Sequence, residues 1–331
     1  MLRVRAPGRV NLIGGHTDYT GGLVLPMAID FATVVEGERG GDEVRLESAD
    51  EAGVAVVALD VEDPAGVTPP WARYIAGVVA ELRPPVGFTG RVSTSIPIGT
   101  GLSSSAALEV AVALALGTDL PPAALAQSLR QAEFRASGVP CGIMDQLASL
   151  TGVEGHAVLI DCTALTITPV PLPPDVDIVV VDSGERRALA TSGYAARRAE
   201  VAAADALLGS LPQATLDDVA VIDDPVLRKR ARHVVTENAR VLAFCAAIAA
   251  GDLATAGEVM VASHASLRDD HEVTTAALDA LVVRLCATPG VYGARLTGGG
   301  WGGCVVALTD PGALTEGWTV RPSAGATVDE L

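Results

Sequence analysis

The sequence predicts an α+β fold of two domains that share a cleft. Its 331 residues exceed one typical domain, and 49% of them are apolar, which is enough for a sizeable core. β-Branched runs dominate the first part of the chain, whereas long Ala/Arg/Glu helical patterns follow residue 177. The proline-rich stretch Thr168–Asp175 separates the two parts and predicts domains at 1–172 and 173–331.

The first domain is predicted to begin with strands and to continue with helices. Runs of β-branched residues between Gly/Asp turns predict strands at Leu23–Ile29, Ala32–Glu36 and Val54–Leu59. Apolar residues at helical spacing then predict helices at Trp71–Leu82, Ser104–Leu116, Pro122–Ser137 and Met144–Leu150.

The second domain is predicted to be mainly helical, with two strands near its end. Helical patterns cover Tyr194–Leu208, Pro225–Ala250 and Asp252–Arg268. Strand-like segments return at Val291–Thr297 and Cys304–Thr309.

Charge and composition exclude several classes of partner. A formal charge of −17 argues against nucleic acid or an anionic membrane as a partner, so any phosphate needs a local site. The N-terminus has no apolar signal region, and we expect no stretch to reach the length of a membrane span. The five scattered cysteines predict reduced, mostly buried thiols. We therefore expect a cytoplasmic protein.

The stretch Pro97–Ala111, PIGTGLSSSAALEVA, predicts an anion-binding loop. Gly99 and Gly101 allow a tight turn, and the serines that follow open an Ala/Leu helix whose N-terminus offers free N–H donors. The serine hydroxyls are suited to Mg²⁺. The lysine of a Walker A loop is missing, and the chain has a single lysine, Lys229. An ordinary Gly/Ser loop with a serine N-cap is the alternative.

Two carboxylates near residues 133–145 are candidates for acid–base or metal chemistry. Asp145 follows the apolar, glycine-bounded sequence CGIM, and Glu133 lies twelve residues upstream near the end of a predicted helix. One could bind a metal while the other orients or deprotonates a hydroxyl. The alternative is a helix-capping Asp145 and a solvated Glu133.

A glycine-rich segment, Leu296–Leu308, formally contains the dinucleotide fingerprint at Gly298, Gly300 and Gly303. We reject that interpretation because the glycines run into a strand and no acidic residue follows at the required distance. A turn between two strands that lets backbone approach a ligand is expected instead.

Three further segments carry weaker signals. Tyr194 is placed at the start of a helix, where it suits packing as well as binding. The histidine-containing segments RARHVVTEN and SHASLRDDHEV lack metal-ligand spacing, so we expect solvated faces or contacts between domains.

Together these motifs resemble the galactokinase branch of the GHMP small-molecule kinases. The motifs that carry the resemblance occur in the order of the family: GRVNLIGGHTDYTGG, PIGTGLSSSA, CGIMDQ, VDSG, RARHVVTEN, SHASLRDD and TGGGWGG. The resemblance implies a mixed α/β N-terminal domain, an α+β C-terminal domain and an active site between them. It also implies transfer of the ATP γ-phosphoryl group to the anomeric C1 hydroxyl of D-galactose, by a monomer or weak oligomer.

The resemblance assigns a role to each candidate residue. Asp145 would act on the anomeric hydroxyl beside Arg9, as a base or as an electrostatic orienter. The sugar would be positioned by Gly15, His16, Asp18, Gly142 and Tyr194. ATP would bind Gly99, Gly101, Leu102, Ser103, Ser104 and Ser105, with Trp71 and Tyr74 near the adenine. Mg²⁺ would be held by Ser105 and Glu133. Gly298–Gly303 would approach the ligands from the other domain.

Two residues depart from the pattern of the family. Galactokinases usually carry GEHTDY, whose glutamate accepts a hydrogen bond from the C6 hydroxyl of the sugar, and this chain has Gly15 there. Loss of such a bond costs about 1.5–3 kcal/mol. Galactose remains the first expectation; L-arabinose, a 6-deoxy sugar or galacturonate is the alternative. Trp301 replaces a usual phenylalanine.

A non-catalytic sugar and ATP sensor is a further alternative within the family. Sensors have a damaged Gly/Ser loop, whereas GLSSSAALE is uninterrupted here. Because Glu133, Asp145 and Arg9 are also present, we expect an enzyme.

Overall fold

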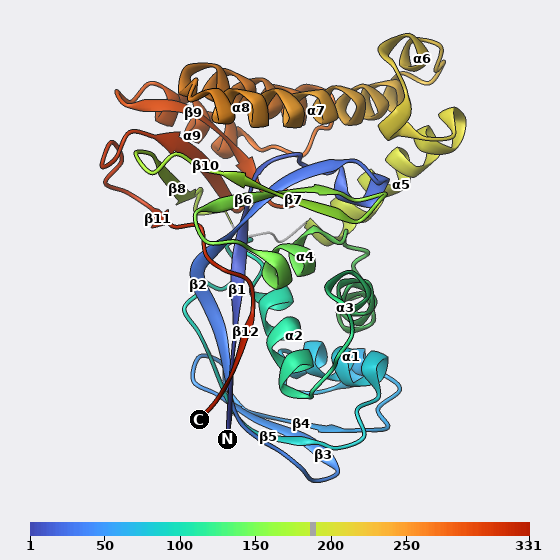
Figure 1. Ribbon diagram of the computed structural model, residues 1–331. Helices are drawn as coiled ribbons and strands as arrows, with labels where there is room; N and C mark the ends of the chain where they lie inside the picture. Colours follow the sequence, from blue (N-terminus) through green and yellow to red (C-terminus); the bar gives the residue numbers. More distant parts are fainter. Residues whose placement is uncertain (186–189) are drawn as a thin grey trace.

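Two sheets and the helices packed on them form the molecule (Figure 1). The computed structural model describes the backbone of residues 1–185 and 190–331 and the side chains outside 186–192. The larger sheet has the strand order β12-β1-β2-β5-β3-β4, and β6 extends it by pairing with β2 and β7. Its strands are β1 (Leu2–Ile13), β2 (Leu23–Arg39), β3 (Glu43–Ser48), β4 (Val54–Ala58), β5 (Phe88–Thr94), β6 (His156–Asp161), β7 (Thr166–Pro171) and β12 (Thr327–Glu330).

Strand β2 is continuous, so the prediction of two strands at 23–29 and 32–36 is wrong in that detail. Asp30 looked like a turn residue, but it is exposed in mid-strand and binds the segment near the C-terminus instead. Its backbone N–H donates to Arg321 O at 3.1 Å, and its carboxylate accepts from Arg321 N at 2.9 Å. The pairing of β1 with β2 shifts register between Pro7 and Arg9. A bulge therefore absorbs the polar residue without ending the strand.

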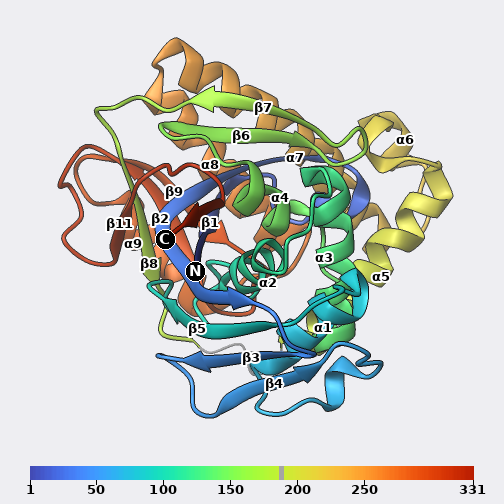
Figure 2. The ribbon, with the colours of Figure 1, turned by 60° about the horizontal axis from the view of Figure 1, so that its bottom comes forward.

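Four helices cover one face of this sheet: α1 (Ala72–Leu82), α2 (Ser104–Ala115), α3 (Pro122–Ser137) and α4 (Met144–Thr151). Helix α2 contacts β1 and β2 on one side and the other three helices on the other (Figure 2). The bounds of α3 follow from Pro122 in its first turn and Gly138, which ends it with a φ of 72°. This packing brings the N-terminus of α2 close to α3 and α4.

The second sheet has the antiparallel order β11-β8-β10-β9 and carries the remaining long helices. Its strands are β8 (Asp177–Asp182), β9 (Val291–Thr297), β10 (Cys304–Thr309) and β11 (Trp318–Val320). Helices α8 and α9 pack on β9, and α7 packs on α8 and α5. The helices are α5 (Ala190–Leu208), α6 (Leu216–Ala220), α7 (Pro225–Ala250), α8 (Leu253–Asp269) and α9 (Ala276–Cys286), and three short 3-10 helices are η1 (Asp18–Thr20), η2 (Pro64–Gly66) and η3 (Leu211–Gln213).

Side-chain caps explain why α7 and α8 begin within one residue of their predicted starts. The carboxylates of Asp224 and Asp252 accept backbone N–H groups there, and the Thr275 hydroxyl does so for α9, a helix outside the predicted ranges. Tyr194 is not at a helix start, because α5 already begins at Ala190.

Helix α7 corrects the expectation that no stretch reaches membrane-spanning length. With 26 residues, the helix is long and apolar enough to cross a membrane, by length and composition alone. However, α7 packs on α5, α8 and β2, and it buries His233 and Glu237. A helix that packs on neighbouring elements in this way passes the same test.

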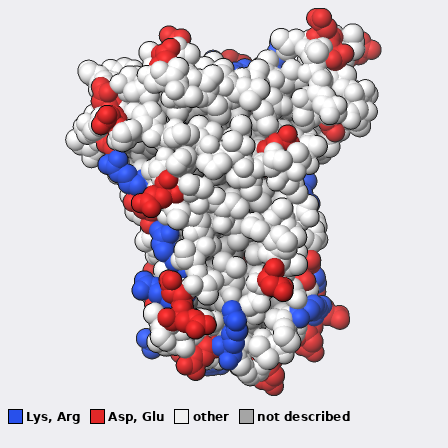
Figure 3. All heavy atoms as spheres, viewed as in Figure 1, with Lys and Arg blue, Asp and Glu red and all other residues white. Residues whose placement is uncertain are grey.

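The two chain ends lie side by side, because β12 pairs antiparallel with β1 (Figure 1). The last strand of the chain thus joins the larger sheet, and the division at 172/173 stays a prediction. Figure 3 shows basic side chains interspersed with acidic ones around β3–β5 on this face. Cys141, Cys162, Cys245 and Cys286 are free thiols and half-buried, and only Cys304 is buried, so the expectation of mostly buried thiols is wrong.

Candidate active site

One cavity of about 840 Å³ gathers nearly all the candidate residues of the sequence. It lies where β1, the loop before α2, the start of α4 and the β9–β10 turn meet. Its lining includes Arg9, Gly15, His16, Asp18, Trp71, Tyr74, Gly99, Gly101, Ser103, Ser104, Ser105, Glu133, Gly142, Asp145, Tyr194, Gly298, Gly299 and Gly300. Leu102 is the exception, because its side chain is buried in the core.

The loop before α2 folds into a concave turn through three residues with left-handed backbone. Gly99, Gly101 and Ser103 have φ values of 79°, 84° and 62°. No atom lies within 4 Å of the place where a Cβ of Gly99 would sit, so the turn is open there. Alternation of left-handed residues directs successive N–H groups to one side, as in anion-binding nests.

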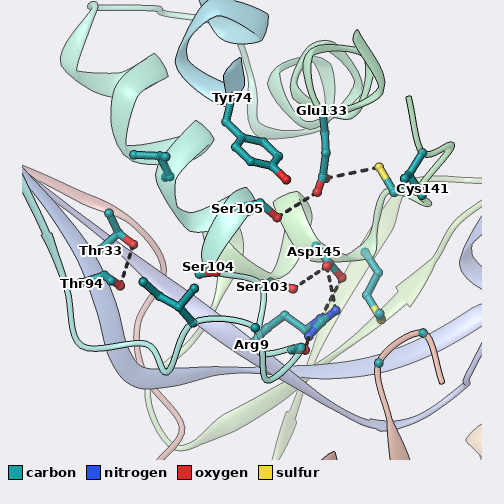
Figure 4. A pocket seen from close by; sticks show the side chains of 18 of the residues that line it. Arg9, Thr33, Tyr74, Thr94, Ser103, Ser104, Ser105, Glu133, Cys141 and Asp145 are labelled. Atoms are coloured by element: carbon teal, nitrogen blue, oxygen red, sulfur yellow. Dashed lines mark hydrogen bonds and ion pairs between the residues drawn. The ribbon is translucent and has the colours of Figure 1, made fainter. Parts of the chain in front are cut away.

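Ser103 does not cap α2, so the alternative of a serine-capped ordinary loop is wrong. The residue stands at the N-cap position, but its side chain makes no capping hydrogen bond. Its hydroxyl instead donates to the carboxylate of Asp145 (Figure 4). The loop and the first turn of α4 are therefore joined by a hydrogen bond between side chains that lie 42 residues apart.

Arg9 holds Asp145 in a bidentate ion pair. Arg9 Nε donates to Asp145 Oδ1 at 2.8 Å, and Nη2 donates to Oδ2 at 2.7 Å. Arg9 Nη1 donates to Gly101 O at 2.6 Å, which ties the pair to the loop. Asp145 lies in the first turn of α4 without capping it, so the capping alternative is also wrong. With Ser103, three donors fill three of the roughly four acceptor positions of this carboxylate.

Glu133 is a half-buried carboxylate held by three neighbours, so the solvated alternative is wrong as well. Its Oε1 accepts from Ser105 Oγ at 2.9 Å, and its Oε2 accepts from Gln146 Nε2 at 2.7 Å and from Cys141 Sγ at 3.3 Å. Burial, followed by the charge of Asp145, raises the pKa of Glu133. Figure 4 shows Ser105, Glu133 and Tyr74 directed into the same space.

The far end of the cavity contains a cluster of rings around His16 that lie tilted or edge-on to one another. The His16 ring lies 5.5 Å from Tyr194 and 4.5 Å from His271, centroid to centroid. Its Nδ1 lies 3.1 Å from Tyr19 Oη, and its buried Nε2 has no hydrogen-bond partner among the described residues. Burial lowers the pKa of His16 to about 3, so this imidazole is neutral.

Asp18 lines the same end of the cavity as His16, and its carboxylate packs directly against Gly142. A Cβ on Gly142 would lie 1.6 Å from Asp18 Oδ2, so only glycine leaves room for the carboxylate. Burial and the nearby charge of Asp145 raise the pKa of Asp18 to about 6. Arg198 Nη1 donates to Pro140 O and, at 3.0 Å, to Cys141 O, and thereby fixes the segment before Gly142 to α5.

The space beside Gly15 is taken by a buried arginine. A Cβ at position 15 would lie 2.5 Å from Arg295 Nη2, and the Arg295 side chain is 1% exposed. Arg295 Nη1 donates to Asn11 O at 3.3 Å, Nη2 lies 3.8 Å from Glu237, and Nε has no partner among the described residues. Glycine at this position thus has a steric reason within the chain itself.

The histidines of the two histidine-containing segments are buried, which corrects the expectation of solvated faces for these side chains, whereas Arg232 and Arg268 are exposed. Glu237 is fully buried and its Oε1 accepts from the backbone N–H groups of Gly14 and Gly15. His233 Nε2 lies 2.9 Å from Gly15 O, and the ring of His271 lies tilted with its centroid 4.4 Å from that of His233. Glu237, His233 and His271 therefore contact residues 14–16 and hold them in place, although they lie more than 200 residues away in the sequence.

Trp301 faces away from the cavity lining. A Cβ on Gly193 would lie 2.9 Å from its ring, and the guanidinium of Arg197 lies 5.9 Å from the ring centroid. The turn that contains Trp301 joins antiparallel β9 and β10, which confirms the rejection of the dinucleotide fold. Gly303 lies outside the lining, and its carbonyl accepts from Ser183 N at 2.9 Å.

The sequence did not single out several lining residues. Asn11 lies inside the motif GRVNLIGGHTDYTGG and Cys141 inside CGIMDQ, but neither residue type by itself indicates a role in the site. Polar residues at the ends of β3 and β5, such as Ser48 and Thr94, are a further sequence signal that could have indicated lining residues. These unassigned lining residues are Asn11, Thr33, Ser48, Asp50, Glu51, Val92, Ser93, Thr94, Ile98, Leu108, Val139, Cys141 and Met144.

The fold and the site together define a GHMP kinase. The sequence models of the GHMP kinase N-terminal and C-terminal domains match residues 73–153 and 244–318, and the galactokinase galactose-binding signature matches residues 2–39. Mevalonate kinase, 21% identical with a TM-score of 0.64, shares the fold alone.

Similarity to galactokinases extends over almost the whole chain. Human galactokinase is 44% identical over 94% of this chain and 84% of its own length, and that of Roseiflexus is 46% identical over 93% and 83%. The structure of Lactococcus lactis galactokinase with galactose is 33% identical, with a TM-score of 0.91 over 98% of this chain and 95% of its own. The chain belongs to the galactokinase family.

Proposed function

We propose that this chain is an ATP-dependent galactose 1-kinase that acts in the cytoplasm. The observation that carries the proposal is the position of Asp145 and Arg9, which lie between the concave loop before α2 and the ring-lined end of the cavity. The loop supplies N–H groups for phosphates, and the other end supplies polar groups for a sugar. A phosphoryl acceptor between them meets a carboxylate and a guanidinium.

The residues divide the task between the two ends. Gly99, Gly101 and the serines at 103–105 bind the phosphates, and Trp71 and Tyr74 lie at the adenine. His16 Nε2 is a buried polar atom without a hydrogen-bond partner among the described residues, and a sugar hydroxyl would form a hydrogen bond with it. Asp18, Gly142 and Tyr194 complete the sugar site.

Asp145 keeps one acceptor position for the sugar. Its other positions are taken by Arg9 and Ser103, so its orientation is fixed before any ligand binds. The free position accepts the anomeric O–H and aims its oxygen at the γ-phosphoryl group. Arg9 adds positive charge close to the group in transfer.

Ser105 and Glu133 fit a magnesium ion. A hydroxyl and a carboxylate oxygen lie 2.9 Å apart in the lining, and both are donors that Mg²⁺ accepts. Burial and, after it, the nearby charge of Asp145 raise the pKa of Glu133, and a cation would offset both effects. The described residues contain no group of three His, Cys, Asp or Glu that could hold a metal. Ser105 and Glu133 would hold the ion together with substrate phosphates, and the bound ion would supply positive charge for the transfer.

The test is ADP release with MgATP and each of D-galactose, L-arabinose, D-galacturonate and 6-deoxy-D-galactose. We expect galactose to give the highest kcat/KM. Another sugar leading by about tenfold would overturn the substrate and leave the kinase intact. Sugar-dependent ATP binding without ADP release from any of the four would instead identify a sensor.

Gly15→Glu is expected to raise the preference for galactose over L-arabinose about tenfold, because a carboxylate gains a hydrogen bond to the C6 hydroxyl. The new side chain must displace Arg295 Nη2, whose neighbouring Nε has no partner to lose among the described residues. The measurement is the ratio of kcat/KM for the two sugars. Gly15→Gln is the matched control without charge, and an unchanged ratio in a folded Gly15→Glu protein would contradict the expectation.

The kcat/KM for the sugar is expected to fall below pH 6. Asp18 has a pKa of about 6, and only its charged form accepts hydrogen bonds at both oxygens. Affinity is therefore complete above pH 6 and falls about tenfold per pH unit below it. His16, with a pKa of about 3, does not titrate in this range. The acidic limb should vanish in Asp18→Asn, and a limb that persists there would assign it to another group.

A further inference from the structure

Helix α2 places a second carboxylate behind the proposed metal site. Glu109 lies four residues after Ser105, so both project from the same side of the helix. Ser105 reaches the cavity, whereas Glu109 is 0% exposed and does not line it. The proposed function uses Ser105 and gives Glu109 no task. An acidic side chain that is buried completely needs a compensating partner.

The partner is Gln146, which connects Glu109 to Glu133. Gln146 is fully buried in α4, directly after Asp145. Its Nε2 donates to Glu133 Oε2 at 2.7 Å and to Glu109 Oε2 at 3.4 Å. A single amide group thus touches both carboxylates, and both of its N–H bonds are used.

Two acceptors of this group remain without a donor. Glu109 Oε1 and Gln146 Oε1 are both buried and have no hydrogen-bond partner within the described part of the chain. An ionised Glu109 offers no donor and leaves both oxygens unsatisfied, which is costly in a buried site. A proton on Glu109 Oε1 would supply the donor that Gln146 Oε1 lacks. Together with the Nε2–Oε2 contact at 3.4 Å, it would close an acid–amide pair with two hydrogen bonds.

The surrounding charges favour the protonated form. Burial, followed by the charge of Glu133, raises the pKa of Glu109 well above its usual range. The hydrogen bond from Gln146 acts on this pKa in the opposite direction, and among the described residues no arginine or lysine lowers it further. The hydrogen-bond inventory and the electrostatics therefore point to the same state.

We propose that Glu109 is a positioning residue, held as a neutral carboxylic acid, that fixes the Gln146 amide and through it the carboxylate of Glu133. With Gln146 Oε1 bound to Glu109, its Nε2 is directed at Glu133, and a flipped amide would set two oxygens against each other. Glu133 Oε1 is then left to Ser105 and the cavity. The role of Glu133 as a metal ligand rests on the proposed function, but the acid–amide pair does not.

The protonated acid is tested by the infrared difference spectrum between the wild type and Glu109→Gln at pH 7. Both full-length proteins are saturated with Mg²⁺ and a non-hydrolysable ATP analogue. The wild type should show the carbonyl band of a protonated carboxyl group that shifts in D₂O and is absent from Glu109→Gln. If no such band is lost, Glu109 is ionised and the proposal is overturned. This measurement does not depend on any sugar or on turnover.

The positioning role is tested by binding of Mn²⁺, a magnetic substitute for Mg²⁺, to the complex with the ATP analogue. Glu109→Met cannot hold Gln146 and should weaken Mn²⁺ binding at least about tenfold. Glu109→Gln keeps an amide that pairs with Gln146 and should stay within about threefold of the wild type. Affinity for the analogue without metal should not change in either variant.

Three results would contradict this role. They are unchanged Mn²⁺ affinity in folded Glu109→Met, an equal loss in both variants, and a loss of analogue binding without metal. A loss of thermal stability alone would show that Glu109 only supports the core. If Glu109→Met does not fold, Glu109→Gln and the infrared band still decide the acid–amide pair. Absence of sugar phosphorylation by the wild type would overturn the proposed function and leave the infrared result standing.

Discussion

Asp145→Asn is expected to lower kcat for galactose at least about a thousandfold and to leave ATP affinity within about threefold. Both oxygens of Asp145 accept N–H groups of Arg9 in the present structure. An amide turns one oxygen into a donor that faces the guanidinium. It thereby loses the charge, the acceptor for the sugar hydroxyl and the fixed position of Arg9 together.

ADP release gives kcat, and calorimetric titration with a non-hydrolysable ATP analogue gives the affinity. Asp175→Asn is the control, because that aspartate is exposed and lies outside the cavity lining. Turnover near the wild-type rate in Asp145→Asn would remove Asp145 from the reaction. The large loss is expected for a base as well as for an orienter. A base should in addition change the pH dependence of single-turnover rates in Ser103→Ala, which frees one acceptor position of Asp145.

Gly142→Ala is expected to raise KM for galactose at least about a hundredfold, which corresponds to the loss of one or two charged hydrogen bonds. The added methyl would lie 1.6 Å from Asp18 Oδ2 and 2.1 Å from its Cγ, so the Asp18 carboxyl group must leave its place. ATP affinity should not change, because the loop at residues 99–105 lies at the other end of the cavity. The measurements are KM for the sugar and the melting temperature.

A double-mutant cycle separates the collision from other effects. Asp18→Ala removes the group that the methyl strikes, so adding Gly142→Ala to it should cost little further stability. Sugar KM should be as high in the double variant as in Asp18→Ala alone. Strictly additive losses of stability would show that the two residues do not meet as the structure has them.

The sequence predicted the elements whose signals are local. Helix α3 has the predicted bounds because Pro122 and Gly138 mark its ends. Helix α7 and strands β9 and β10 also have the bounds that the sequence predicted. Long strands with a polar residue in the middle were harder to predict. At Asp30, a bond to Arg321 replaces the turn that the aspartate suggested.

The motifs indicated the residue types of the site but not their connections. Glycines followed by serines predicted an anion-binding loop, and the cavity contains that loop. The local pattern also allowed Ser103 to cap its helix and Asp145 to cap the next one. Both alternatives fail because Arg9, from a strand far earlier in the chain, binds the Asp145 carboxylate, and Ser103 donates to that same carboxylate.

The sequence by itself determined the family, the two-part α+β fold and the set of candidate side chains, because these are encoded in local patterns and in motifs read in order. Only the tertiary structure decided which of these groups are partners. Arg295 fills the space beside Gly15, Asp18 presses on Gly142, and Gln146 joins Glu109 to Glu133. Each of these pairs is set by the packing of distant elements, and burial there fixes charge states that no local pattern can encode.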